Sequence, residues 1–325
     1  MFDRTLLVAA VLSLVGIVGC ARSHTRSVSD GPSIEVLGSS GGSGSSAYLA
    51  AQGGRLFFVD RALGAARTVA IDGASTEMRA STFATADVYT YPFVAMDAGA
   101  FYWLEVRGGL SVVTARLDSP RSTIAARGDI GPVGLAIDGG LLYFARQQTG
   151  SERIDLLEIE LASGHERVVT DCSGVLGIAV DEDHLFATTC RSEGGVWRVA
   201  RAGGPRVPIA HHTFCPMTIA IDDTRVYYVD SFGGVSGDFA VLSVPKEGGE
   251  PTLVTPTDGL AFAVRDGSVL AFDEGALVEV AIDGGARTVL AQGITGAMGV
   301  AADDDHVYYT AADASGALVA HAVAR

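Results

Sequence analysis

The sequence contains little of several residue types on which large classes of protein depend. Of its 325 residues, 4 are cysteine and 2 are tryptophan, and 23 lysine and arginine residues face 38 aspartate and glutamate residues. The net charge of −15 disfavours nucleic acid and anionic membrane surfaces as partners. A hydrophobic content of 48% supplies ample material for a large core.

Signatures of common catalytic and cofactor sites are also missing. The chain has no phosphate-binding loop with a lysine and no H-E-x-x-H pair. Gly38–Gly42 fits G-x-S-x-G, but it lies in a Gly/Ser-rich stretch with no strand before it and no helix after it, so it predicts no nucleophile. We therefore assign no catalytic residue, no cofactor and no metal.

Long hydrophobic runs are absent except at the N-terminus. The run from Leu6 to Gly19, "LLVAAVLSLVGIVG", has the length of a signal-peptide core and is short for a membrane span. The "IVGC" that ends it, Ile17 to Cys20, resembles the lipobox of bacterial lipoproteins. The resemblance implies removal of residues 1–19, acylation of Cys20, and a lipid-anchored protein in the cell envelope. Because Ala21 follows the cysteine, the sorting rule that comes with the resemblance favours the outer membrane of a diderm host.

Residues 20–32 are polar and carry no apolar period, which predicts a lipidated flexible tether. The remaining residues, 33–325, carry a repeat. A position that we call the anchor recurs every 38 to 45 residues, at Gln52, Asp97, Asp138, Asp181, Asp222, Arg265 and Asp303. Two residues before every anchor stands an alanine. Apolar residues stand three before, four after and five after every anchor.

Each unit of the repeat contains four short runs suited to strands. Around Asp222 these are "MTIAID", "RVYYVD", "FAVLSVP" and "EPTLVT", and the last two are joined by the glycine turn "KEGG". Helical periodicity of useful length is absent. Four-stranded units of about 40 residues are typical of a β-propeller. The predicted fold class is therefore all-β, a single seven-bladed propeller.

The alanine of each unit is expected on the innermost strand, where blades converge and little room is left. The anchor aspartate has two interpretations. In the first, its carboxylate binds the backbone N–H groups of its own turn. In the second, the carboxylates form a metal-binding ring, but Gln52 and Arg265 interrupt such a ring.

The last unit ends after its third strand run, and a spare strand run precedes the first unit. We expect Ile34 to Leu37 to supply the outer strand of blade seven, which closes the propeller and fills an open edge. Gly38 to Ser46 would then be a loop inside the propeller.

Two repeat families share these patterns. "YYVD", Tyr227 to Asp230, resembles the YWTD repeat, and "GLAID" followed by "LLYF" resembles the NHL repeat. The resemblance covers the whole domain and implies a propeller, but no activity. It also implies that the terminal aspartates, Asp60, Asp230 and Asp273, make structural bonds between blades. The chain departs from both families in its loose consensus, and from YWTD domains in its seven units where six are usual.

Any ligand site is expected on the face that carries the loops between blades and the loops from second to third strand, which we call the top face. Aromatic, basic and acidic side chains assigned to that face are candidates for binding a sugar, a peptide or an acidic group: Tyr89, Tyr91, Arg107, Arg146, Arg191, His211, His212 and Asp230. A solvated rim without a ligand is the alternative. His211, His212 and Cys215 on one loop lack a carboxylate partner, which makes a weak metal signal.

The three cysteines left after Cys20 all fall on the top face of one sector. In an oxidising compartment two of them should pair. We expect Cys172–Cys190, with Cys190–Cys215 as the alternative. The chain as a whole fits a monomeric, non-catalytic binding or scaffold protein, held at the membrane by its lipid, with an envelope protein, peptide or glycan as ligand. A propeller hydrolase or lyase, similar to gluconolactonase-like lactonases or streptogramin lyases, is the alternative.

Overall fold

The computed structural model describes the following residues, to which every structural statement below applies: 34–39, 48–52, 54–60, 65–70, 75–78, 94–97, 100–106, 110–116, 122–128, 134–147, 154–172, 174–190, 194–210, 213–232, 238–283, 285–312 and 318–325. The leader, Cys20 and the tether lie outside this range. Within it, we find no helix of a length and apolarity that could cross a membrane.

The described strands form seven four-stranded antiparallel sheets, and six of them run in sequence order from the centre outward. The first three sheets contain β2(Tyr48–Gln52), β3(Arg55–Asp60), β4(Ala65–Ala70) and β5(Ser75–Met78); β6(Val94–Asp97), β7(Ala100–Val106), β8(Leu110–Arg116) and β9(Ser122–Gly128); and β10(Leu135–Asp138), β11(Leu141–Gln147), β12(Ile154–Glu160) and β13(His165–Cys172).

The next three sheets contain β14(Val175–Val180), β15(His184–Thr189), β16(Gly195–Ala200) and β17(Val207–Ala210); β18(Ile219–Ile221), β19(Arg225–Phe232), β20(Asp238–Pro245) and β21(Thr252–Thr257); and β22(Phe262–Arg265), β23(Ser268–Asp273), β24(Ala276–Ala281) and β25(Arg287–Ala291). The last sheet has the order β1(Ile34–Ser39), β28(Leu318–Ala324), β27(His306–Ala312) and β26(Gly299–Ala302).

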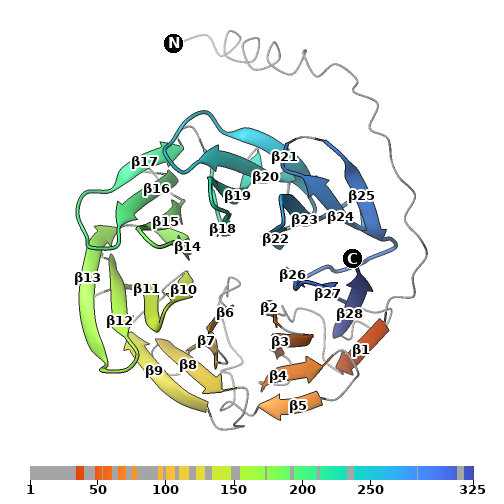
Figure 1. The fold of residues 1–325 in the computed structure, drawn as a ribbon, viewed down its shortest axis with the longest axis horizontal. Coiled ribbons are helices and arrows are strands. Elements are labelled where there is room, and N and C mark those ends of the chain that lie inside the picture. Colours follow the sequence, from red (N-terminus) through yellow and green to blue (C-terminus); the bar gives the residue numbers. More distant parts are fainter. Residues whose placement is uncertain are drawn as a thin grey trace, which may run out of the picture.

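The sheets stand around a common axis as the blades of a β-propeller, with β2, β6, β10, β14, β18, β22 and β26 innermost (Figure 1). The propeller prediction is confirmed. In the last sheet, β1 pairs antiparallel with β28, from Ile34 opposite Ala322 to Ser39 opposite Leu318, with one irregularity between Glu35 and Leu37. The two ends of the described chain therefore share one sheet.

The repeated alanine has a reason that differs from the one we expected. In every sheet it lies directly opposite the large residue five positions after the anchor, for example Ala136 opposite Tyr143 and Ala301 opposite Tyr308. The same pairing recurs in the five other sheets. Cross-strand partners on one face share limited space, so a bulky side chain on the second strand requires a small one on the first.

The hydrophobic core lies between adjacent blades. One cluster joins Tyr143 and Leu156 of the third sheet to Leu185 and Trp197 of the fourth, and another joins Phe58 of the first sheet to Tyr308 of the last. The residues four and five positions after each anchor are all buried, as their repetition indicates. Because each blade buries both faces against its neighbours, apolar residues occur on both faces of the inner strands.

The glycine turns between third and fourth strands have the backbone geometry that their sequence indicates. Gly203 in "RAGG" and Gly248 in "KEGG" have φ of 95° and 99°. Residues other than glycine rarely adopt this left-handed backbone region. These turns, together with the turns at the anchors, form the face opposite the top face, which we call the bottom face.

Candidate functional site

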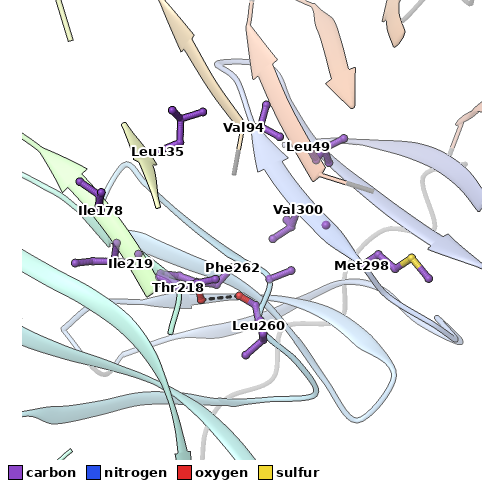
Figure 2. A pocket seen from close by; sticks show the side chains of 13 residues that line it. Leu49, Val94, Leu135, Ile178, Thr218, Ile219, Leu260, Phe262, Met298 and Val300 are labelled. Carbon is purple, nitrogen blue, oxygen red and sulfur yellow. Dashed lines mark hydrogen bonds between the residues drawn. The ribbon is translucent and has the colours of Figure 1, made fainter. Parts of the chain in front are cut away.

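A cavity of about 260 Å³ lies on the propeller axis, and each innermost strand contributes one side chain to its wall (Figure 2). These seven residues are the ones three positions before each anchor: Leu49, Val94, Leu135, Ile178, Ile219, Phe262 and Val300. Residues of the loops that lead into β18, β22 and β26 also line the cavity, so the cavity lies toward the top face. It is partly open to solvent.

The rest of the described wall comes from two glycines of innermost strands, Gly177 in β14 and Gly299 in β26, and from loops that lead into innermost strands: Thr218, Leu260, Ala261 and Met298. None of the lining residues that the structure describes has an ionisable side chain, and the hydroxyl of Thr218 is the one side-chain hydrogen-bonding group among them. That hydroxyl donates to the carbonyl oxygen of Leu260 at 2.7 Å, which joins two loops across the wall (Figure 2). Other polar contacts with a ligand would come from backbone groups.

The segment before Thr218 is held by a disulfide and a buried carboxylate. Cys215 is bonded to Cys190 of the neighbouring blade, with 4.4 Å between their Cα atoms. Asp230 is 3% exposed, and its two oxygens accept the backbone N–H groups of Phe214 at 2.9 Å and Cys215 at 2.7 Å. Phe214 itself projects into solvent, 60% exposed.

The disulfide corrects our first expectation, which paired Cys172 with Cys190. The observed bond is the alternative, Cys190–Cys215, and Cys172 is the free thiol. Cys172 ends β13 and is buried in the apolar cluster between the third and fourth sheets, beside Val175 and Trp197. Burial raises the pKa of its thiol to about 12. Strand order alone could not show that the side chain of Cys172 turns into the core.

Two of the predicted top-face candidates can be assessed, and neither lines the cavity. Arg146 is engaged in an ion pair with Glu166 at 3.0 Å. Asp230 accepts backbone N–H groups of the loop that leads from the fourth sheet into its own sheet, which gives it a structural role. The other candidates lie outside the described residues: Tyr89, Tyr91, Arg107, Arg191, His211 and His212.

The anchor aspartates hold turns on the bottom face. Asp222 accepts the N–H groups of Thr224 and Arg225, each at 2.7 Å, and the hydroxyl of Tyr227 at 2.6 Å. Burial opposes the charged form, but these hydrogen bonds outweigh it and hold the pKa of Asp222 below its ordinary value. Among the described residues, no three His, Cys, Asp or Glu side chains gather as metal ligands would.

Basic residues that follow two of the third strands, Arg201 and Lys246, connect an anchor turn to the next blade. Arg201 approaches Asp138 at 2.6 Å and lies over the ring of Tyr143, and Lys246 approaches Asp181 at 2.7 Å. These pairs are partly buried, so solvent screens them less than fully exposed pairs. These ion pairs connect neighbouring blades, and none of their residues lines the axial cavity.

Sequence reasoning missed the cavity wall, although its signal was present. In the sequence, the apolar positions three before each anchor are recognised as part of the repeat and not as a cavity wall. Seven such positions, one for each blade, must meet at the axis when the blades form a ring. The sizes of these seven side chains, which range from valine to phenylalanine, therefore indicate the shape of the axial cavity.

The sequence matches no protein-family model and no curated protein. Solved structures with the same fold include the oligogalacturonate lyase of Vibrio parahaemolyticus (TM-score 0.63, 13% identity, 92% of this chain and 96% of that one) and the virginiamycin B lyase of Staphylococcus aureus (0.61, 12%, 86% and 95%). The β-propeller domain of the Trilobed protease from Pyrococcus furiosus is similar to the same degree (0.61, 12%, 86% and 93%). At these identities the likeness is one of fold.

Proposed function

We propose that this chain is a lipid-anchored protein of the cell envelope whose propeller binds a ligand without transforming it. Residues 1–19 are its signal peptide, 20–32 its tether and 33–325 a single seven-bladed propeller closed by β1. The anchor is supported by the lipobox-like "IVGC", and the closure by the pairing of β1 with β28. The envelope location, at the outer membrane if the host is diderm, rests on the leader alone.

One observation carries the choice of binding over catalysis. The described residues that line the axial cavity present apolar side chains and one hydroxyl, and none of them can act as an acid, a base or an ionised nucleophile near neutral pH. Apolar side chains together with polar backbone groups and one placed hydroxyl can bind and orient a small ligand. The lyases among the fold neighbours share too little sequence to transfer an active site.

The test recovers the ligand from the full lipidated protein. The protein is purified in mild detergent from its own envelope, and small molecules released on denaturation are identified by mass spectrometry. Ala261→Leu adds bulk to the cavity wall, and Ala286→Leu makes the same change at an exposed turn of the same sheet. We expect a molecule that accompanies wild type and Ala286→Leu and is reduced at least tenfold in Ala261→Leu.

The same preparation distinguishes binding from catalysis. Envelope extract is incubated with each protein, and its components are compared before and after. An unchanged extract together with a cavity-dependent ligand supports the proposal. Conversion of an extract component by wild type, lost in Ala261→Leu, would instead establish an enzyme.

A further inference from the structure

We infer that the axial cavity takes a neutral molecule about the size of a substituted single ring, which donates a hydrogen bond to Thr218. This inference rests on the proposed binding function and specifies its ligand class. It follows from the volume of the cavity, from the charge of its wall and from the bonding state of one hydroxyl.

The volume sets the size of the ligand. An apolar cavity of roughly 150 Å³ accommodates benzene, which has six heavy atoms. By the same proportion the axial cavity, about 260 Å³, accommodates roughly ten heavy atoms. A larger molecule would have to extend through the open side of the cavity toward the top face.

The wall selects against charge. A charged group that enters the cavity leaves its hydration shell and finds no ionisable side chain in the part of the wall that the structure describes. The net charge of −15 adds a further penalty for anions through the field of the whole molecule. Both effects favour a neutral ligand and disfavour carboxylates and phosphates in particular.

Thr218 selects for a hydrogen-bond donor. A carbonyl oxygen can only accept, so in the 2.7 Å contact with Leu260 the proton of the Thr218 hydroxyl must be the donated one. Only the lone pairs of Oγ1 remain for a ligand. A hydroxyl or N–H on the ligand can use them, whereas an ether or ester oxygen in the same place finds no proton.

The backbone around Thr218 is held in place before any ligand arrives. Its carbonyl accepts the N–H of Val229 at 3.1 Å, and the N–H of Met217 donates to the carbonyl of Val229 at 2.8 Å. Three residues earlier, Cys215 is held by its disulfide and by Asp230. A preorganised acceptor loses little conformational freedom on binding, which favours selectivity at this position.

Calorimetry with three small probes tests the inference on the full lipidated protein in detergent. The probes are 4-propylphenol, its methyl ether and 4-propylbenzoate, which share one apolar body and differ in the polar group. We expect the phenol to bind about three- to tenfold more tightly than the ether, the range for one neutral hydrogen bond. The benzoate should show no measurable binding.

Variants of Thr218 and of the cavity wall test whether the preference for the phenol over the ether arises in this cavity. Thr218→Val should equalise phenol and ether, whereas Thr218→Ser, which keeps the hydroxyl, should retain the preference. Ala261→Leu should weaken binding of the phenol at least tenfold, and Ala286→Leu should not. If the valine variant fails to fold, the Ala261→Leu and Ala286→Leu pair still decides whether the phenol occupies this cavity.

Three results would overturn the inference: equal affinity for phenol and ether in wild type, preferred binding of the benzoate, or no binding of any probe. If an envelope ligand is nevertheless recovered from wild type and lost in Ala261→Leu, the binding function stands and the ligand class is wrong. If an extract component is converted, the binding function itself is wrong.

Discussion

The carboxylate of Asp303 accepts a hydrogen bond from the backbone N–H of Gly54 at 2.8 Å, although 249 positions separate the two residues. Asp303 is the anchor of the last sheet, and Gly54 lies in the turn between β2 and β3 of the first. The same carboxylate accepts the Tyr308 hydroxyl at 3.0 Å and the N–H groups of Asp305 and His306. One side chain therefore fixes its own turn and bonds the last sheet to the first.

Replacing Asp303 by alanine should lower the free energy of unfolding by about 2–4 kcal/mol, because hydrogen bonds to a charged group are worth about 1.5–3 kcal/mol and are not additive. Denaturant titration measures the loss. Asp304→Ala removes the adjacent carboxylate, which is 91% exposed and pairs with Arg265, and should cost less than about 1 kcal/mol. Equal losses in the two variants would contradict the role given to Asp303.

Acid should destabilise the domain by protonating the anchor aspartates. Burial opposes their charged forms, yet hydrogen bonds and ion pairs hold the pKa values of Asp181, Asp222 and Asp303 below the ordinary value. The unfolded chain, with a pKa of about 3.9, therefore binds protons first as the pH falls. The stability from these groups is complete above about pH 5 and is lost as the pH falls through 3.9 toward the folded pKa values.

Thermal melting between pH 7 and pH 3 measures this loss. Asp222→Asn should be less stable than wild type at pH 7 and show a shallower decline in acid. Asp223→Asn, which removes the neighbouring exposed carboxylate, controls for the change in net charge. A decline in Asp222→Asn as steep as in wild type would show that other groups cause the acid sensitivity.

Deleting residues 33–37 should destabilise the whole domain, because it removes most of β1 from β28 and leaves an open sheet edge. We expect the melting temperature to fall by about 5–10 °C, which corresponds to about 2–4 kcal/mol in a domain of this size. Deletion of residues 25–29 in the tether is the matched control. If both deletion variants melted at the same temperature as wild type, β1 would contribute nothing to the stability of the closed propeller.

The oxidised protein should contain one disulfide-linked peptide pair, Cys190 with Cys215, and one thiol, Cys172, that resists alkylation until the domain unfolds. Cys172 is 6% exposed, and burial raises its pKa to about 12, so little thiolate exists at pH 8. Peptide mapping after alkylation, with and without denaturant, detects both the Cys190–Cys215 linkage and the protection of Cys172 from alkylation. Rapid alkylation of Cys172 in the folded protein would contradict its burial.

Removing the disulfide by Cys190→Ala with Cys215→Ala should cost at most about 3.5 kcal/mol by loop-closure entropy, given a separation of 25 residues. Cys172→Ala serves as the control that keeps the bond.

Cys20→Ser should move the protein from the membrane fraction to the soluble fraction, because it removes the proposed acyl chains that hold the protein at the membrane. Each buried methylene contributes about 0.8 kcal/mol to membrane affinity, so loss of the chains should release nearly all of it. Fractionation and immunoblotting measure the distribution. Membrane association that persists in the variant would indicate that the apolar run from Leu6 to Gly19 remains as an anchor.

The sequence by itself determined the propeller, its repeat unit and the core positions. A residue such as Tyr143 or Tyr227 recurs at a constant distance from its anchor because each blade must bury the same strand against the same neighbour. The turn role of Asp222 was also readable, since an aspartate and the N–H groups it binds lie within three residues. Such features depend on local spacing, and local spacing is what a repeat displays.

The tertiary structure alone decided which groups meet across blades. Cys190 pairs with Cys215 because the loop entering β18 returns to the end of β15, while the side chain of Cys172 turns into the core. Thr218 reaches Leu260, 42 positions away, and seven separate strands place one side chain each around a single cavity. These relationships depend on how the blades are oriented about the axis, and side-chain direction across a ring has no signature in the spacing along the chain.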